Sequence, residues 1–332
     1  MMKCLLLVAA VAYASALPRI VDHSEGGYET YWETGGEIDS ENNDSSSSFN
    51  STNTYSGSRI VGGEVIGSNK YPFLVAIVNY DPTFTQYDHH CGGSLISHRH
   101  VVSAGHCFVG YDLRMFAVRL GSDEMTNPST PVKLIDNITV HPDYLDLGGH
   151  SINDIAMITL NEAIVFSSNY QPVCLPSPTF DITGHAVTTL GWGWINPYGV
   201  LITNPKELHT NVINTNQCNE HWKEKEIQIN PITQLCTKVP IETSCHGDSG
   251  GPVFWEVPQK NMYILVGVVS FGNNICVGEL PNVHTRVAAY VPWIRNVMVF
   301  QVLNQRVDQY GLGLYYYSFI FPTNGIPFKM SE

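Results

Sequence analysis

The chain has 332 residues, a formal net charge of −13 at pH 7 and 43% hydrophobic residues. Its acidic balance and its lack of any basic run argue against nucleic acids and anionic membrane surfaces as partners. The apolar stretches near its two ends are each too short to span a bilayer.

Residues 1–16 have the pattern of a secretory signal peptide. Lys3 precedes the apolar run Leu5–Ala12, and Ala14-Ser15-Ala16 supplies small residues at a cleavage site. A buried N-terminal helix is the alternative, and the cleavage motif argues against it. We therefore expect a secreted, extracellular protein.

Residues 17–59 are predicted to be an acidic, Ser-rich propeptide. Eight acids against two arginines, together with Ser45–Ser48, leave too little apolar surface to offset the entropy of ordering the segment. Asn-x-Ser/Thr sequons predict glycosylation at three positions, and two of them lie in this segment. The three acceptors are Asn43, Asn50 and Asn137.

From Tyr71 onward, short apolar runs alternate with turn residues, which predicts an all-β fold of the barrel or sandwich type. One helix is expected at Tyr290–Leu303, with Pro292 in its first turn. About 240 residues is long for one domain, but β-barrels often reach that size. The predicted strands are Phe73–Val78, Val101–Ala104, Phe116–Leu120, Ile155–Leu160, Ala186–Leu190, Val253–Trp255 and Tyr263–Ser270.

Three stretches carry residues suited to nucleophilic catalysis. Cys245–Pro252 places Ser249 after an aspartate and before two glycines, Val102–Cys107 contains His106, and Asn153–Leu160 contains Asp154. A serine hydroxyl is a weak nucleophile, so it needs a base, an acid that orients the base, and donors for the developing oxyanion. Each stretch alone is compatible with an ordinary turn or cap, but together they predict a catalytic site.

In the order His106, Asp154, Ser249, these motifs resemble the catalytic triad of the chymotrypsin/trypsin-like secreted serine proteases. The resemblance covers residues 60–298 and implies two antiparallel six-stranded β-barrels, with the triad in the cleft between them and a C-terminal helix. It implies that Ser249 attacks the peptide carbonyl, His106 moves the proton and Asp154 orients the imidazole. The oxyanion would be held by the N–H groups of Gly247 and Ser249.

The stretch Ser58–Gly63 resembles the activation site of the same family. Cleavage after Arg59 would free the α-ammonium of Ile60, which would pair with Asp248 and so form the oxyanion hole. Breaking a buried pair of this kind costs about 3–5 kcal/mol, enough to keep the uncut zymogen inactive.

The resemblance also locates the substrate pocket, at Thr243, Ser270, Gly272 and Asn282. The pocket floor would be Thr243, where trypsin-like enzymes have aspartate, and the second floor position would be Asn282, where the family usually has glycine. An Arg or Lys side chain would be desolvated there without a charged partner. We therefore expect chymotrypsin- or elastase-like cleavage after apolar or small neutral residues, and activation at Arg59 by a separate trypsin-like protease.

Seven cysteines remain after signal removal, and spacing alone leaves many pairings open. The resemblance implies the disulfides Cys91–Cys107, Cys218–Cys236 and Cys245–Cys276. It leaves Cys174 either free or bonded to another molecule. No Cys-x-x-Cys or His-x-x-x-His spacing predicts a metal site. Gly121–Val140 also lacks the paired glutamates of the family's calcium loop, so no metal or other cofactor is expected.

Residues 299–332 extend beyond the resemblance and include the apolar run Tyr315–Phe321. This extension is expected either to pack on the barrel surface or to bind a partner. Two classes of function follow. The first is an active endopeptidase with protein substrates and possible protein inhibitors. The second is a binding protein on a protease scaffold that works through its propeptide or its C-terminal tail.

Overall fold

The computed structural model describes residues 63–67, 69–79, 88–121, 124–125, 127, 129–193, 203–238, 247–273 and 280–310, with the backbone alone for 300–310. Several predictions fall outside these residues. They are the signal peptide and propeptide, the glycosylation sites Asn43 and Asn50, the activation residues Arg59 and Ile60, the pocket residue Thr243, the disulfide Cys245–Cys276 and the apolar run Tyr315–Phe321.

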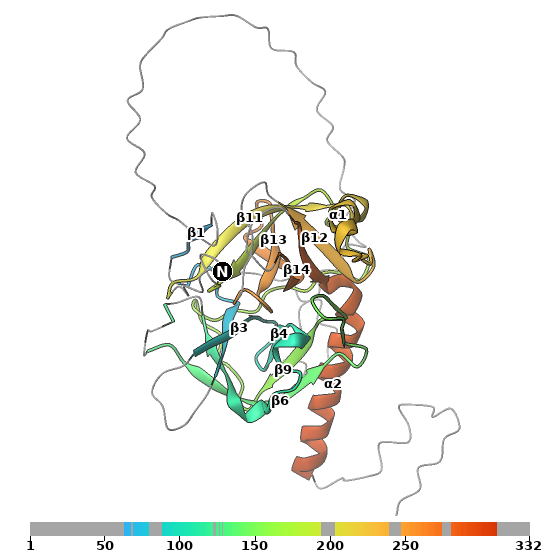
Figure 1. Cartoon of the computed structure of the whole chain (residues 1–332). Coiled ribbons are helices and arrows are strands. Elements are labelled where there is room, and N and C mark those ends of the chain that lie inside the picture. Colours follow the sequence, from blue (N-terminus) through green and yellow to red (C-terminus); the bar gives the residue numbers. More distant parts are fainter. Residues whose placement is uncertain are drawn as a thin grey trace, which may run out of the picture.

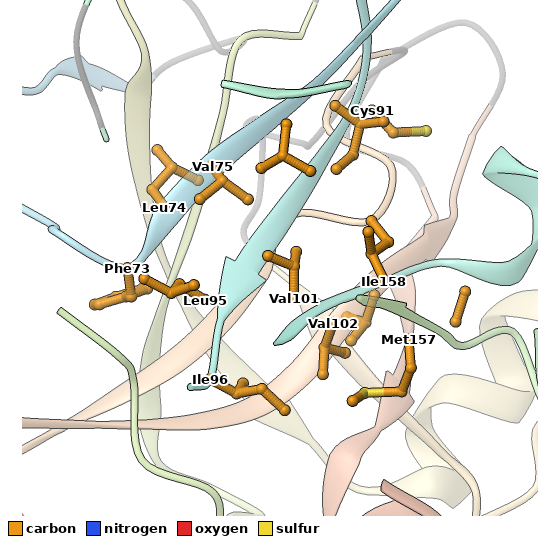
Figure 2. Packing of buried hydrophobic residues seen from close by; sticks show 14 of the residues in the cluster. Phe73, Leu74, Val75, Cys91, Leu95, Ile96, Val101, Val102, Met157 and Ile158 are labelled. Carbon is orange, nitrogen blue, oxygen red and sulfur yellow. The ribbon is translucent and has the colours of Figure 1, made fainter. Parts of the chain in front are cut away.

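The first half of the chain forms a closed antiparallel barrel of six strands in the order β2-β3-β4-β9-β6-β5. Its interior is filled by apolar side chains from successive strands, among them Val75, Leu95, Val101 and Ile158 (Figure 2). The strands are β2 (Leu74–Asn79), β3 (Asp88–Leu95), β4 (His100–Ser103), β5 (Phe116–Leu120), β6 (Val132–Val140) and β9 (Ala156–Leu160).

The second half forms another antiparallel barrel, in the order β11-β10-β13-β14-β15-β12 and closed by pairing of β12 with β11. The short strand β1 (Glu64–Val65) pairs with the first two residues of β11, before the part of β11 that pairs with β12. The fold is therefore the predicted pair of six-stranded barrels (Figure 1). The strands are β10 (Ala186–Gly191), β11 (Lys206–Ile213), β12 (Gln234–Lys238), β13 (Pro252–Val257), β14 (Met262–Phe271) and β15 (Asn282–Arg286).

The two barrels meet through an aromatic cluster. Phe73 packs edge-on against Phe254 of β13 at 5.2 Å between ring centroids, and Tyr263 of β14 lies 5.2 Å from Phe254. Tyr71 completes the cluster at 5.0 Å from Phe254. Aromatic pairs in this geometry contribute about 0.5–1.5 kcal/mol each beyond their buried area. The interface between the two barrels is thus itself part of the hydrophobic core.

The C-terminal helix α2 (Val287–Tyr310) is longer than the predicted Tyr290–Leu303. It runs from the second barrel along the side of the first and past its edge (Figure 1). The core-facing residues of its first half, including Ile294 and Met298, are fully buried against the first barrel. Among the described residues, no helix combines the length and the apolar character needed to cross a membrane.

The remaining elements are short and lie in the connections between strands. In α1, Asn214 and Gln217 form a reciprocal capping box that satisfies the first free N–H groups of the helix. These elements are η1 (Gly105–Cys107), η2 (Leu113–Met115), β7 (Leu145–Asp146), β8 (Ser151–Ile152), α1 (Thr215–Trp222) and η3 (Lys223–Lys225).

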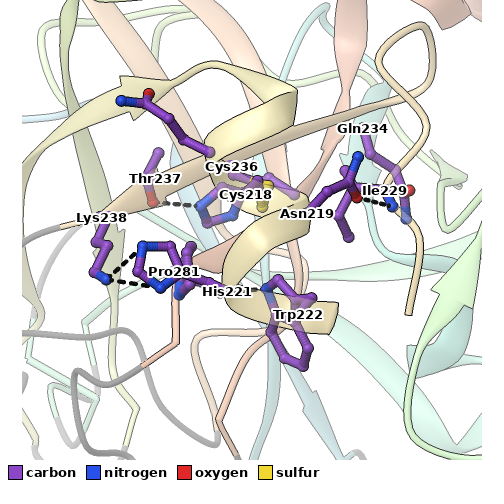
Figure 3. The surroundings of a disulfide bond; sticks show 12 residues. Cys218, Asn219, His221, Trp222, Ile229, Gln234, Cys236, Thr237, Lys238 and Pro281 are labelled. Carbon is purple, nitrogen blue, oxygen red and sulfur yellow. Dashed lines mark hydrogen bonds between the residues drawn. A yellow bond between two sulfur atoms is a disulfide. The ribbon is translucent and has the colours of Figure 1, made fainter. Parts of the chain in front are cut away.

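Two predicted disulfides are present. Cys91–Cys107 joins β3 to the 3-10 turn η1, and Cys218–Cys236 joins α1 to β12. Around the second bond, the indole N–H of Trp222 donates to the carbonyl of Pro281 at 3.2 Å (Figure 3). Disulfides in loops of this size each contribute about 2–4 kcal/mol.

The expectation for Cys174 was wrong. Its side chain is fully buried, and its sulfur is disulfide-bonded within this chain to a partner outside the described residues. The backbone of Cys174 bridges to Ile264 of β14, which places this residue inside the second core cluster. Spacing gave no partner for this cysteine, and the family resemblance left it either free or bonded to another molecule.

Candidate active site

His106 lies in η1, immediately after β4 of the first barrel. Val101 and Val102 of β4 are fully buried, so they fix the point at which the chain enters the turn. The disulfide of Cys107, the next residue, clamps the other side of the histidine. The imidazole keeps 30% of its surface exposed, which leaves part of the ring accessible to solvent.

Asp154 fixes the orientation of this imidazole through two hydrogen bonds. Its Oδ2 lies 2.8 Å from Nδ1 of His106, and its Oδ1 accepts from the backbone N–H of His106 at 2.9 Å. The hydroxyl of Ser270 donates to Oδ2 at 2.5 Å. Ser270, which was predicted as a substrate-pocket residue, thus contacts the carboxylate of Asp154. With the carboxylate 1% exposed, these bonds fix both its position and that of the ring.

The two groups shift each other's pKa. Burial lowers the pKa of His106, but the hydrogen bond and the charge of Asp154 outweigh it, so the net pKa is raised. Burial raises the pKa of Asp154, but the charge of His106 and the hydrogen bonds from His106 and Ser270 lower it overall. The interaction between the two groups therefore favours an ionised Asp154 carboxylate and a His106 imidazole that accepts a proton readily.

Ser249 is half-buried in a tight turn that leads into β13. Its carbonyl accepts from the N–H of Gly92 in β3 at 2.7 Å. Gly250 has φ of +77°, and a Cβ on it would collide with the hydroxyl of Ser103, the last residue of β4. The serine turn is thus pressed against the strand that leads into His106, an approach that only glycine permits.

The backbone before Ser249 is also constrained. Gly247 has φ of +95°, and its carbonyl faces Nε2 of His89 at 2.7 Å. Because a carbonyl only accepts, Nε2 of His89 carries the proton. Among the described residues, none accepts a hydrogen bond from the N–H of Gly247 or of Ser249. These two groups are the predicted oxyanion donors.

Asp248 is fully buried beside the segment that follows β10. The N–H of Gly193 donates to its Oδ1 at 2.9 Å. A Cβ on either Gly191 or Gly193 would overlap the carboxylate, so both glycines make room for it.

Two of the predicted pocket residues face each other closely. A Cβ on Gly272 would lie 2.5 Å from Oδ1 of Asn282, so the amide of Asn282 lies directly over Gly272. Asn282 begins β15 and is buried, with 6% of its surface exposed. His284, two residues further along the same face of the strand, is fully buried with Nε2 2.8 Å from the hydroxyl of Thr237.

Comparison with known proteins agrees with this arrangement. A family model described as Trypsin matches residues 60–294, well over half of the chain. The chain belongs to the trypsin family of serine proteases.

The protease is 32% identical over 251 residues to Venom serine protease of Polistes dominula, covering 73% of this chain and 86% of that protein. It is 33% identical over 272 residues to Serine protease ea of Drosophila melanogaster, covering 72% of this chain and 67% of that protein. It is 30% identical over 246 residues to Venom serine protease 34 of Apis mellifera, of which the match covers 58%. The chain is a serine-type endopeptidase.

One group in the described part of the protease has the side chains of a metal site. Ligand atoms of Cys91, His106 and Cys107 lie within 4.8 Å of one another. Both sulfurs are joined in a disulfide, however, and a metal requires thiolates. This group is therefore the clamp on the histidine and not a metal centre.

The sequence motifs did not identify all the residues that hold the protease site. His89, Thr285 and Tyr290 were not predicted, although each touches the backbone or a neighbour of a predicted site residue. For His89 the sequence does contain a signal, the dipeptide His89-His90 next to Cys91. Thr285 and Tyr290 lie in ordinary strand and helix sequence, so no motif indicates them.

Proposed function

We propose that this chain is a secreted zymogen whose mature form hydrolyses peptide bonds through Ser249, His106 and Asp154. The observation that carries the proposal is the pair of hydrogen bonds between Asp154 and His106. In addition, the turn that contains Ser249 packs against β3 and against the end of β4, the strand that precedes His106. The partners of such an enzyme are protein or peptide substrates, an activating protease and protein inhibitors.

In this mechanism the hydroxyl oxygen of Ser249 attacks the carbonyl carbon, and Nε2 of His106 takes its proton. The N–H groups of Gly247 and Ser249 stabilise the oxyanion. The C–N bond then breaks as His106 returns the proton to the leaving amine. Water hydrolyses the acyl-enzyme by the same steps, and Asp154 keeps the imidazole in the tautomer that accepts at Nε2.

Activation is proposed to follow cleavage after Arg59. The free ammonium of Ile60 would pair with the buried carboxylate of Asp248, the residue between the two predicted oxyanion donors Gly247 and Ser249. Burying a carboxylate is costly, and a cationic partner offsets part of that cost. The ion pair would thereby stabilise the turn that presents Gly247 and Ser249.

The specificity is proposed to be for small or apolar neutral residues before the scissile bond. The position of Asn282 supports this specificity, because its amide covers Gly272 and so reduces the space for a substrate side chain in the predicted pocket. Thr243, the predicted floor, carries no charge, so a basic side chain would lose its hydration without gaining an ion pair. It follows that the mature enzyme does not cut at Arg59 and that a trypsin-like protease activates it.

Cleavage of a peptide library by the activated enzyme tests the specificity. We expect small neutral residues before the cut, and Asn282→Gly should shift the preference toward larger apolar side chains because it reopens the space over Gly272. Asn161→Gly, an exposed position in the first barrel, is the matched control and should leave the profile unchanged. A clear preference for Arg or Lys in the parent enzyme would overturn the proposal.

Secretion and glycosylation belong to the same proposal. Asn137 is exposed on β6, and its amide donates to the hydroxyl of Thr139, the third residue of its sequon, at 3.0 Å. The acceptor is therefore accessible in the folded protein. We propose glycans at Asn137 and at the sequons of Asn43 and Asn50 in the propeptide.

A further inference from the structure

Three hydroxyl groups from outside the first barrel converge on the segment that carries Asp154. Ser270 of β14 donates to its carboxylate, and Thr285 of β15 donates to its carbonyl at 2.6 Å. The third is Tyr290 of α2, which does not touch Asp154. Its hydroxyl donates to Oδ1 of Asn153, the preceding residue, at 2.8 Å.

Asn153 has a backbone conformation that needs support. Its φ is +50°, in the left-handed region that non-glycine residues rarely adopt, and its carbonyl accepts from the N–H of Ile155 at 2.9 Å. The chain therefore turns sharply at the residue before Asp154. Asparagine tolerates this conformation better than most residues, but at a cost that the surroundings must offset.

The side chain of Asn153 is held at both ends. Oδ1 accepts from Tyr290, and Nδ2 donates to the carbonyl of Asp143 at 2.7 Å. Tyr290 is itself fixed, because its ring packs edge-on against His141 at 5.2 Å and its side chain is only 4% exposed. Burial raises the pKa of Tyr290 to about 12, so its hydroxyl stays protonated and remains a donor.

We propose that Tyr290, acting through Asn153, is a positioning residue for the catalytic aspartate. The C-terminal helix holds the left-handed turn, the turn sets the direction of Asp154, and Asp154 sets the imidazole of His106. This inference rests on the proposed function, since it assigns Tyr290 a part in the same reaction.

The test compares activated Tyr290→Phe with the parent enzyme, with all rates normalised to the fraction of sites that a fluorophosphonate titrates. We expect kcat to fall about tenfold, the size of effect that follows when a buried acceptor loses its donor, with KM within about twofold. The acidic limb of kcat/KM should move to lower pH, because a looser Asp154 stabilises the imidazolium less. Asp146, the other acid that raises the pKa of His106, is unchanged in this variant, so a shift of the acidic limb would be assigned to Asp154.

Two variants of Asn153 separate the backbone from the side chain. Asn153→Gly keeps access to positive φ but loses the amide, whereas Asn153→Ala loses both, so the alanine variant should be the slower enzyme. Tyr263→Phe is the matched control, since it too removes only a phenol hydroxyl, from a half-buried tyrosine whose ring packs in the aromatic cluster between the barrels. It should leave kcat and the acidic limb unchanged.

The inference is overturned if Tyr290→Phe keeps the parent kcat and acidic limb, or if Tyr263→Phe shows the same loss. A parent enzyme that the fluorophosphonate does not label would instead overturn the proposed function and this inference with it. A parent that is labelled, beside a Tyr290→Phe variant of equal kcat, overturns the inference alone.

Discussion

At the scale of single residues, the histidines show how environment decides function. Asp154 raises the pKa of His106, which suits a base that must take a proton from a hydroxyl. His89 and His284 have no carboxylate partner of this kind, and burial lowers their pKa values to about 4 and about 3. Nδ1 of each is buried and finds no hydrogen-bond partner among the described residues, so protonation would place a charge in the core without compensation from them.

The two lowered values predict loss of stability in mild acid. Below pH 6.5 the unfolded chain binds protons at both histidines while the folded chain does not, so the free energy of unfolding falls as pH falls, down to about pH 4 for His89 and about pH 3 for His284. Each histidine contributes up to about 1.4 kcal/mol per pH unit. Urea unfolding between pH 7 and pH 4.5 measures this slope.

His284→Gln should remove about half of that slope while keeping a polar partner for Thr237. His185→Gln, at an exposed position, controls for the exchange of histidine for glutamine. A His284→Gln slope equal to that of the parent would contradict the assignment of the acid sensitivity to the buried imidazole.

The residue scale also shows the limit of prediction from sequence. His106, Asp154 and Ser249 were predictable because each lies in a short motif whose residue types are needed for the chemistry. Asn153 and Tyr290 were not, because a left-handed turn and a hydroxyl 137 residues away leave no local pattern. Contacts between distant segments depend on the fold, which spacing does not encode.

At the scale of elements, a buried polar cluster fastens the start of the protease domain to the second barrel. Glu207 of β11 is 4% exposed and binds Nζ of Lys70 at 2.6 Å. Its other oxygen accepts from the hydroxyl of Tyr71. Nζ of Lys206, the neighbour of Glu207, donates to the carbonyl of Gly63 at 3.3 Å. Together they hold the segment after the proposed activation site.

Tyr71→Phe should therefore destabilise the protein by about 1–3 kcal/mol, because a buried carboxylate oxygen loses a donor while the ring contacts remain. Thermal unfolding of the intact chain would report this as a lower Tm. Tyr111→Phe, at a position 52% exposed, is the control. Equal Tm values for the two variants would show that the hydroxyl of Tyr71 contributes nothing to stability.

The predicted strands were those with continuous apolar runs, such as β2, β9 and β14, and all seven are present. The pattern missed strands whose residues are polar, small or exposed. β3 contains His89, His90 and two glycines, and in β6 only one of nine residues is buried. These strands are held by pairing with their neighbours and not by their own hydrophobicity, so only the closed barrel defines them.

At the scale of the whole molecule, the site joins the two barrels. His106 and Asp154 belong to the first barrel, whereas Ser249 and Ser270 belong to the second. The two barrels also meet at the aromatic cluster of Phe73, Phe254 and Tyr263. Catalytic activity should therefore depend on how the two barrels are placed relative to each other, as well as on the identity of the three triad residues.

The family resemblance predicted this architecture correctly, since motifs in both halves of the chain specify a known fold. It did not identify the disulfide of Cys174, and it did not predict the end of α2, which lies beyond the residues that the resemblance covers. The boundaries of the signal peptide, the propeptide, the 60–298 protease domain and the 299–332 extension remain predictions.

The most direct test of the account is fluorophosphonate labelling of the full chain before and after limited trypsin cleavage at Arg59, with Ser249→Ala as control. We predict labelling only after the cut and only when Ser249 is present, because the oxyanion turn then gains its buried ion pair. Equal labelling before the cut would contradict the zymogen mechanism. No labelling of a cut, folded sample would contradict the catalytic site and favour a binding role for the propeptide or the C-terminal tail.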